Sequence, residues 1–281
     1  MQLSEKINNL PSISEILKEN DFFTKKSLGQ NFIFDLNFTS KIARQAGNLE
    51  NYLVIEIGGG AGSLTRAILQ ENPKKLLVIE KDERCIKILS ELKEISENKM
   101  EIINQDALKV DYKKIVAEYK LPTKIIANLP YNVGTELLLI WYKNAKIFDE
   151  LILMFQKEVA ERITAKTNDE QYGRLSIISN LVAESEILFL VPPSIFYPPP
   201  RVYSAIVRVK PRKEILFNCN LEKLSKITAS AFNQRRKTIR NSLKNIFAEN
   251  TEKTLQDLNI DGNLRAENLS PEQFAKLAAR Y

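Results

Sequence analysis

The feature that most constrains the fold is a regular alternation of short β-type runs and helical stretches between residues 52 and 156. The stretches between the runs, such as residues 83–95, repeat apolar residues at helical spacing. The five runs are YLVIEIG, KLLVIE, MEIIN, KIIAN and LILMFQ. Strands that are separated by helices pair in parallel, with helices over both faces of the sheet. The sequence therefore predicts an α/β fold on a mostly parallel sheet.

The alternating sequence pattern changes twice after residue 156. Two further β-type segments, ESEILFLV and VYSAIVRV, flank the loop PPSIFYPPPR and predict an antiparallel edge on the same sheet. After Pro211 the alternation stops and short helical patterns follow, the last starting at Ser270-Pro271. We therefore predict two domains, residues 1–210 with the sheet and residues 211–281 as a small all-α domain.

Histidine is absent from all 281 residues. Its absence removes imidazole bases, Ser-His and Cys-His nucleophiles and nearly all zinc sites, so we predict no metal centre. The two cysteines, Cys85 and Cys219, are far apart, which argues against a disulfide framework. No apolar run approaches the roughly 20 residues of a membrane span, and the N-terminus lacks an apolar signal core. We therefore expect a cytoplasmic protein without membrane contact.

The net charge of +6 is unevenly distributed along the chain. Between residues 201 and 245, 12 Lys or Arg face 2 acidic residues, a local charge of +10, so the rest of the chain carries −4. A basic block at one end of a near-neutral body predicts a polyanionic partner. The alternative is a solvated helix surface without a binding role.

Polar or glycine residues follow four consecutive predicted strands. The first is followed by the loop GGGAG, and the others by Glu80, Asp106 and Asn128. Ligands of open parallel sheets bind at the carboxyl ends of the strands, so these residues predict a small-molecule site. The glycine loop and Glu80 alone would also fit a nicotinamide dinucleotide, but that ligand gives no role to the turn NLPY.

The turn NLPY, residues 128–131, places a carboxamide, a proline-fixed carbonyl and a phenol ring together at the end of a predicted buried strand. A turn needs only the Asn and the Pro, so Tyr131 requires a further reason.

Several motifs together resemble one enzyme family. The series EIGGGAGSLT, Glu80, QDAL and NLPY resembles the successive motifs of class I S-adenosylmethionine-dependent methyltransferases. The segments KKSLGQNFIFD, MFQKEVAERI, YGRLS and SIFYPPPRVYSAIV resemble the ribosomal RNA adenine dimethyltransferases, of which the bacterial 16S enzymes fit best. The resemblance covers the chain from about residue 20 and departs at Gly59, where the family usually has proline. It implies a Rossmann-like class I methyltransferase sheet and S-adenosylmethionine as cofactor.

The resemblance also implies that NLPY holds the planar amine of an adenine. The Asn128 carboxamide oxygen and the Leu129 carbonyl would accept the two N6 hydrogens, which directs the nitrogen lone pair toward the methyl group. Pro130 would fix the turn, and Tyr131 would offer a ring face on which the base stacks. This chemistry is positional and requires no histidine.

The resemblance implies further individual roles. Phe196 would close the other side of the target adenine, opposite Tyr131. Asn31 and Ile33 would contact the methionine end or the sulfonium, and Gly58 the methionine moiety. Glu80 would bind the ribose hydroxyls, Asp106 the adenine amino group, and Asn128 would border cofactor and substrate alike. The alternatives are structural: Asp106 could cap a helix, and Glu80 could be a solvated strand end.

The tail is the candidate RNA-binding element. In FNQRRKTIRNSLKNIF, residues 232–247, a single helix would place Phe232, Ile239, Leu243 and Ile246 on one stripe. The adjoining stripe, turned toward phosphates, would hold Arg236, Lys237, Arg240 and Lys244. Lys25 and Lys26 could extend this surface beside the active site.

The predicted activity is transfer of methyl groups to N6 of two adjacent adenosines near the 3′ end of 16S rRNA. The partner would be the rRNA of the immature 30S subunit, and we expect a monomer. Two alternatives remain open. One is a 23S rRNA adenine methyltransferase of the resistance type, which shares the active-site motifs. The other is a non-catalytic RNA-binding assembly factor.

Overall fold

The computed structural model describes residues 3–20, 31–214, 216–217, 220–234 and 236–281. The chain divides into two compact units. Unit 1 comprises Met1–Lys157 and Ile187–Lys210, and unit 2 comprises Glu158–Glu186 and Pro211–Tyr281. Lys25, Lys26 and Cys219, which the sequence analysis singled out, lie outside the described residues.

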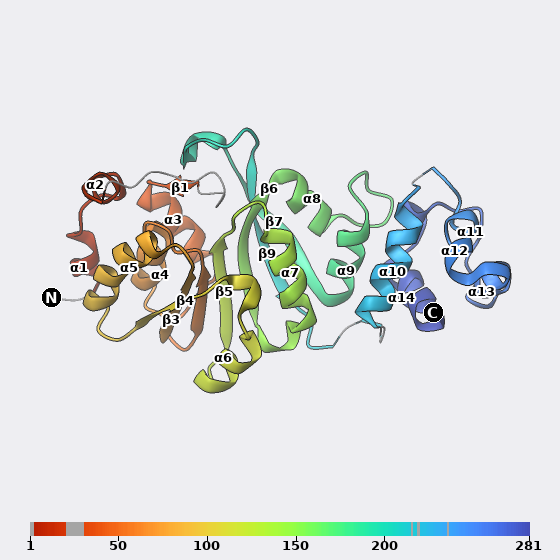
Figure 1. Cartoon of the computed structure of the whole chain (residues 1–281), viewed down its shortest axis with the longest axis horizontal. Helices are drawn as coiled ribbons and strands as arrows, with labels where there is room; N and C mark the ends of the chain where they lie inside the picture. The colour runs from red at the N-terminus through yellow and green to blue at the C-terminus, as the bar shows by residue number, and fades with distance from the viewer. Residues whose placement is uncertain (1–2, 21–30, 215, 218–219, 235) are drawn as a thin grey trace. The chain divides into compact units, whose positions relative to one another are not determined.

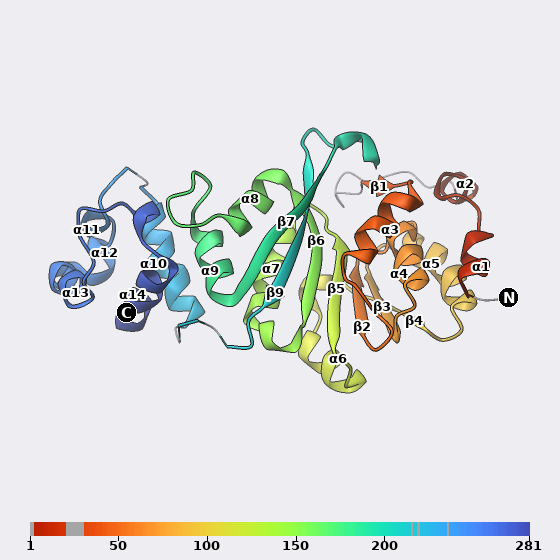
Figure 2. The ribbon, with the colours of Figure 1, turned by 180° about the vertical axis from the view of Figure 1, so that it is seen from behind.

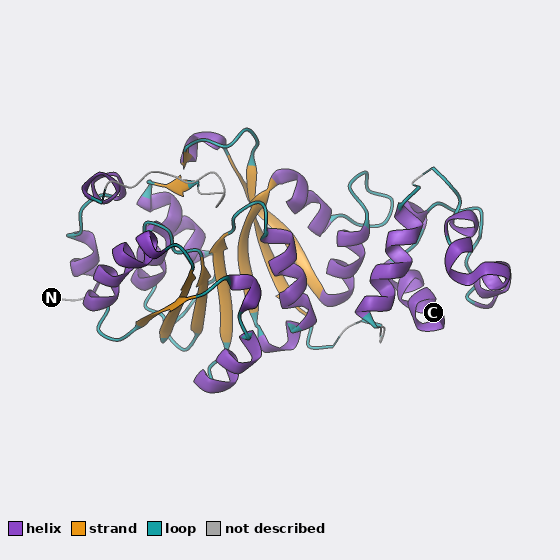
Figure 3. Cartoon of the chain, viewed as in Figure 1, coloured by secondary structure: helices purple, strands orange, loops and turns teal. Residues whose placement is uncertain are grey.

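A seven-stranded sheet, with its strands orange in Figure 3, forms the core of unit 1. Its strand order is β4-β3-β2-β5-β6-β9-β7. The central strand β2 pairs in parallel with both β3 and β5, whereas β9 pairs antiparallel with β6. The predicted α/β class and mostly parallel sheet with an antiparallel edge are confirmed. The strands are β2 (Leu53–Ile57), β3 (Lys75–Glu80), β4 (Met100–Asn104), β5 (Thr123–Asn128), β6 (Glu150–Gln156), β7 (Ala183–Val191) and β9 (Ser204–Pro211).

Helices cover both faces of this sheet, as the crossovers require. Helix α7 (Gly134–Lys143) lies in front of the strands in Figure 1, and α3 (Leu36–Arg44) lies in front of them in the reverse view of Figure 2. Strand β2 is buried at all five positions, which explains its nearly continuous apolar sequence. The remaining crossover helices are α4 (Ser63–Gln70), α5 (Glu83–Ile95) and α6 (Tyr112–Tyr119), with a short 3-10 turn η2 (Ala107–Lys109).

Two short elements precede the sheet, in a region for which the sequence analysis predicted no structure. They are α1 (Leu3–Asn8) and α2 (Ile13–Glu19), the second started by a capping box between Ser12 and Glu15. After the undescribed residues 21–30, strand β1 (Phe32–Ile33) pairs antiparallel with β8 (Phe196–Tyr197), which belongs to the loop between β7 and β9. The pair joins segments more than 160 residues apart in sequence.

Unit 2 combines the C-terminal helices with residues 158–186, which the predicted boundaries assign to the first domain. Tyr172 accounts for part of this grouping, because its hydroxyl donates to the Leu269 carbonyl at 2.9 Å and its ring packs edge-on against Phe232. The helices are α8 (Lys157–Thr164), α9 (Arg174–Val182), α10 (Leu221–Phe232), α11 (Ile239–Ser242), α12 (Lys244–Phe247), α13 (Thr251–Asp257) and α14 (Pro271–Arg280).

The prediction of one continuous helix over residues 232–247 is wrong. Helix α10 ends at Phe232, and Thr238 has an extended backbone with φ −66° and ψ 155° before α11 begins. The backbone of Ile239 donates to Leu264 at 2.7 Å and that of Arg240 to Gly262 at 3.2 Å. These long-range bonds take N–H groups that a continuous helix would use internally, so the chain turns. Ile239 and Leu243 are nevertheless buried, as the apolar stripe predicts.

Within the described part of the chain, no helix has the length and apolar character needed to cross a membrane.

Candidate active site

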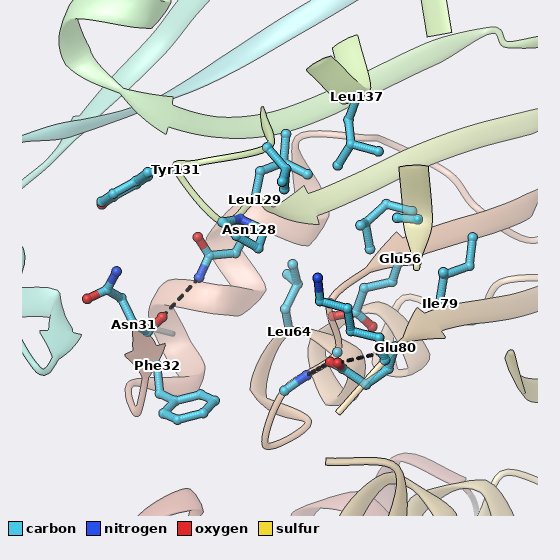
Figure 4. Close-up of a pocket in the computed structure, with 18 of the residues that line it drawn as sticks. Asn31, Phe32, Glu56, Leu64, Ile79, Glu80, Asn128, Leu129, Tyr131 and Leu137 are labelled. Carbon is cyan, nitrogen blue, oxygen red and sulfur yellow. Dashed lines mark hydrogen bonds between the residues drawn. The ribbon is translucent and has the colours of Figure 1, made fainter. Parts of the chain in front are cut away.

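A pocket lies at the carboxyl ends of β2, β3 and β5, where the strand order reverses direction (Figure 4). This is the switch point at which open α/β sheets bind ligands. Its empty volume is about 1170 Å³, part of it open to solvent, which is ample for a nucleoside-sized ligand. The segments that line it are β1 with Asn31, the glycine loop, the start of η2 and residues 128–133.

The glycine loop approaches the pocket with its backbone. Gly58, Gly60 and Gly62 have positive φ angles of 73°, 55° and 85°, a region in which side chains with Cβ are strained. Gly59 needs space rather than conformational freedom, since a Cβ there would lie 2.7 Å from Val78 Cγ1. At the position where the family usually has proline, this chain therefore packs its loop directly onto β3.

Glu80 anchors this loop. Its carboxylate accepts hydrogen bonds from the backbone N–H groups of Gly60 at 3.1 Å, Lys81 at 2.8 Å and Asp82 at 2.9 Å. The residue is 8% exposed and lines the pocket, as predicted for a ligand-binding strand end. The alternative of a solvated strand end is therefore ruled out by its burial. Glu80 shapes the pocket in addition to facing it.

Asp106 combines its predicted position with a capping role. It lines the pocket, and its carboxylate accepts from the Leu108 backbone at 3.1 Å at the start of η2. This backbone hydrogen bond, assisted by the nearby Lys81 charge, lowers the pKa of Asp106. The carboxylate is thus held ionised at the rim of the pocket.

Asn128 ends β5 with its carboxamide aimed into the pocket (Figure 4). The Nδ2 group donates to the backbone carbonyl of Asn31 at 3.3 Å. Since the amide nitrogen is engaged in this way, the Oδ1 oxygen is the atom presented as an acceptor. Leu129 is buried, and the Pro130 carbonyl accepts from Gly134 at 3.1 Å, which couples the turn to the start of α7.

Tyr131 lies on the Asn128 side of the pocket, away from Glu80 (Figure 4). Its hydroxyl is 2.7 Å from Ser204 Oγ, at the start of β9, and Ser204 is fully buried. Burial raises the pKa of Tyr131, so the phenol stays neutral. The hydrogen bond anchors the tip of the Tyr131 side chain next to β9.

The structure gathers all but one of the predicted pocket residues. Phe196 is the exception: it is 4% exposed and belongs to the apolar core, with its backbone paired to Ile33. It is not among the residues that line the described pocket, so its stacking role stays a prediction that requires this loop to rearrange. The pocket brings together Asn31, Ile33, Gly58, Glu80, Asp106, Asn128, Leu129, Pro130 and Tyr131.

Glu56 in β2 also lines the pocket, and the sequence analysis gave it no role. It is 1% exposed, and neither carboxylate oxygen has a hydrogen-bond partner among the described residues. Burial raises its pKa to about 8; the nearby Thr65 hydroxyl opposes this rise, and the Glu80 charge adds to it. A single acidic residue inside an otherwise apolar strand is the signal that could have identified it. A buried carboxylate that no cationic side chain of the described residues pairs with suits a cationic group of a ligand.

The four basic residues predicted on one stripe lie in two different settings in unit 2. Arg236, Lys237 and Lys244 are exposed, whereas Arg240 is partly buried and its Nε lies 2.7 Å from Glu252 Oε2. Arg240 is therefore charge-compensated. The other three remain the candidates for phosphate contacts.

This strand order, with its antiparallel strand beside β6 and its ligand pocket at the switch point, defines a class I methyltransferase, an enzyme class that uses S-adenosylmethionine. The chain belongs to the family described as ribosomal RNA adenine dimethylase, which it matches over residues 22–281.

Relatives and solved structures agree with this membership. The chain is 47% identical to the ribosomal RNA small subunit methyltransferase A of Brucella anthropi over 98% of each chain. It is 44% identical to the protein of the same name from Agrobacterium fabrum, over 97% of this chain and 98% of that one. A dimethyladenosine transferase from Plasmodium falciparum superposes with a TM-score of 0.77 at 26% identity, covering 89% of this chain and 96% of that one. The 23S rRNA methyltransferase ErmE gives a TM-score of 0.66 at 25% identity, covering 89% and 99%.

The residues present fit S-adenosylmethionine. Bound in this pocket, the cofactor would bring an ammonium and a sulfonium, both cationic, next to Glu56, whose buried carboxylate has no partner among the described residues. Glu80 and Asp106 would supply acceptors for ribose hydroxyls and an adenine amino group, and the open backbone at Gly58 leaves room for the methionine moiety.

The cofactor affinity is expected to rise with pH between about 6 and 8. Glu56 is mostly protonated below its pKa of about 8, and a cationic ligand favours the ionised form, so binding releases a proton. Calorimetric titration with S-adenosylmethionine in buffers of different ionisation enthalpy checks this. Glu56→Gln should flatten the pH profile and weaken binding at pH 8. A pH-independent wild-type affinity would contradict the role of Glu56.

Proposed function

We propose that this enzyme dimethylates N6 of two adjacent adenosines near the 3′ end of 16S rRNA, in immature small subunits. The observation that carries the proposal is the Asn128 carboxamide, whose nitrogen is engaged by the Asn31 carbonyl at 3.3 Å so that its oxygen faces the pocket. That oxygen is suited to an amine hydrogen of a planar base.

The chain's residues supply position rather than acid-base chemistry. The N6 lone pair of adenine is delocalised into the ring, so the amine reacts only when its hydrogens are held and its lone pair is freed. Asn128 Oδ1 and the Leu129 carbonyl would accept these hydrogens and stabilise the charge that develops on nitrogen. Tyr131, whose hydroxyl is anchored at Ser204, would stack on the adenine. S-adenosylmethionine supplies the electrophilic methyl group.

The substrate assignment rests on the relatives. Proteins that share 44–47% identity over nearly the whole chain bear the name of a small-subunit rRNA methyltransferase. The similarity to the 23S enzyme ErmE is lower, at 25% identity. The base must leave any duplex to reach the pocket, so the target adenosines would be unpaired or flipped. We further propose that the protein acts as a monomer in the cytoplasm, where immature subunits are found.

The test is transfer of a radiolabelled methyl group to small subunits that lack the modification, followed by mapping of the labelled bases. Label in two adjacent 16S adenosines is the expected result. Label in 23S rRNA instead would support the resistance-type alternative. Binding of cofactor and RNA without transfer to either RNA would support the assembly-factor alternative.

Replacing Arg236 and Lys237 together with alanine is expected to weaken RNA binding and reduce its salt dependence. Each lost phosphate contact lowers the slope of log affinity against log salt by about 0.7–0.9. Both side chains are exposed, whereas Arg240 already faces Glu252, so Arg240→Ala should have the smaller effect.

Filter binding at several salt concentrations measures the slope. A matched control is Lys113→Ala with Lys114→Ala, which removes two exposed charges from α6. An unchanged slope would leave the basic residues as a solvated surface.

A further inference from the structure

The β1–β8 pair sorts adjacent aromatic residues onto opposite faces. Ile33 lies opposite Phe196, and Phe32 lies opposite Tyr197. Ile33 and Phe196 are 3% and 4% exposed and join the core, because side chains alternate along a strand. Tyr197 therefore points the other way and is 57% exposed. Of the two adjacent aromatic residues of β8, Tyr197 is therefore the accessible one and Phe196 the buried one.

Tyr197 is held by a second aromatic ring. The centroids of Phe34 and Tyr197 are 5.3 Å apart at an interplanar angle of 32°. Phe34 in turn packs against an apolar cluster that includes Ile13, Ile16 and Phe32. In this pair, Phe34 is packed against the protein and Tyr197 is exposed to solvent. We call Phe34 and Tyr197 the platform, because a supported and exposed ring is the arrangement on which a base can stack.

Exposed apolar side chains concentrate in the segments that carry this pair. Of the seven large apolar residues that are exposed in the described part of the chain, five lie in the segments that carry the platform. They are Leu36, Leu190, Tyr197, Val202 and Tyr203. Such a concentration in two segments that pair through β1 and β8 is typical of a contact surface. The same loop contains five prolines and the exposed Arg201, so it is stiff and carries positive charge.

Both ends of the platform connect to the amine-holding turn within unit 1. Asn31, directly before β1, accepts the hydrogen bond of Asn128. Ser204, directly after the loop, is bonded to Tyr131. Phe34 lies three residues from Asn31, a distance of roughly 10 Å along an extended chain. The platform is therefore within reach of a nucleotide that neighbours a base held at Asn128.

We propose that Tyr197, supported by Phe34, stacks the unpaired nucleobase next to the target adenosine in the substrate RNA. The inference rests on the proposed function, since it assumes that an RNA adenosine occupies the Asn128 site. Flipping the target leaves its neighbour without a stacking partner on one side, and a ring supported from below replaces that partner. An exposed tyrosine in a loop that also carries an exposed arginine suits a base followed by a phosphate.

The test measures binding of an RNA hairpin whose loop carries two adjacent unmethylated adenosines, in the presence of S-adenosylhomocysteine. Tyr197→Ala should weaken binding by about 5- to 150-fold, the range of one base–aromatic stack. Tyr197→Trp should retain the affinity. Because Tyr197 is exposed, cofactor affinity and melting temperature should match the wild type in both variants.

A second hairpin, abasic at the nucleotides flanking the target, completes the cycle. The wild type should bind this RNA more weakly than the intact hairpin. On the abasic RNA, Tyr197→Ala should bind as well as the wild type does. Equal binding of wild type and Tyr197→Ala to the intact hairpin overturns the proposal. So does a Tyr197→Ala substitution that weakens binding to the intact and the abasic hairpin by the same factor. A wild type that binds both hairpins equally well also overturns it. Failure of the proposed function is seen separately, as absence of methyl transfer from wild type to small subunits.

Discussion

Replacing Asn128 with alanine is expected to lower the rate of methyl transfer by about 100- to 1000-fold, the usual cost of one preorganised polar group that acts on developing charge. The Asn31 carbonyl holds Nδ2 at 3.3 Å, so Oδ1 is in place before the substrate arrives. An acceptor of this kind gains most when the amine nitrogen becomes positive. The turnover number should therefore fall far more than the affinity for RNA or cofactor.

Single-turnover kinetics on under-methylated small subunits separates these effects. The control is Asn144→Ala, which makes the same change at the far end of α7, where the carboxamide donates to the Ile140 carbonyl at 3.1 Å. It should cost some stability and leave the rate near wild type. Near-normal turnover of Asn128→Ala would reduce NLPY to a turn and remove the basis of the proposed mechanism.

The sheet was predictable because its signals are local. Each central strand is an apolar run bounded by a helix, and α5 begins and ends where the periodicity predicts. The polar strand ends Glu80, Asp106 and Asn128 could be placed in one pocket because parallel strands bring their carboxyl ends to one edge.

The missed features depend on contacts between distant segments. The two-residue strands β1 and β8 have no periodicity of their own, and their register alone decides that Phe196 faces the core while Tyr197 faces solvent. The break after Phe232 follows from backbone bonds to Gly262 and Leu264, which helix propensity does not contain. Glu56 is acidic in a strand whose other positions are apolar, but only the folded sheet shows that it borders the pocket.

Replacing Glu80 with alanine is expected to lower the affinity for S-adenosylmethionine by more than about 100-fold. A charged acceptor for the ribose hydroxyls alone accounts for roughly 1.5–3 kcal/mol, or about 10- to 150-fold. The structure adds a second loss, because the same carboxylate holds the N–H groups of Gly60, Lys81 and Asp82. Without this carboxylate the glycine loop loses its anchor. Cofactor binding must then also order the loop, which reduces the binding free energy.

Calorimetric titration of the variants distinguishes the two contributions. Glu83→Ala is the matched control, since it removes an exposed carboxylate at the start of α5 and should bind the cofactor normally. Glu80→Gln should lie between wild type and Glu80→Ala: its single carbonyl oxygen can still accept from Lys81 and Asp82, whereas its amide NH₂ would face the Gly60 N–H. If Glu80→Ala binds as tightly as Glu83→Ala, neither ribose binding nor anchoring of the loop can be assigned to Glu80. If Glu80→Gln matches wild type, one neutral acceptor suffices and the negative charge of this carboxylate has no part in holding the cofactor.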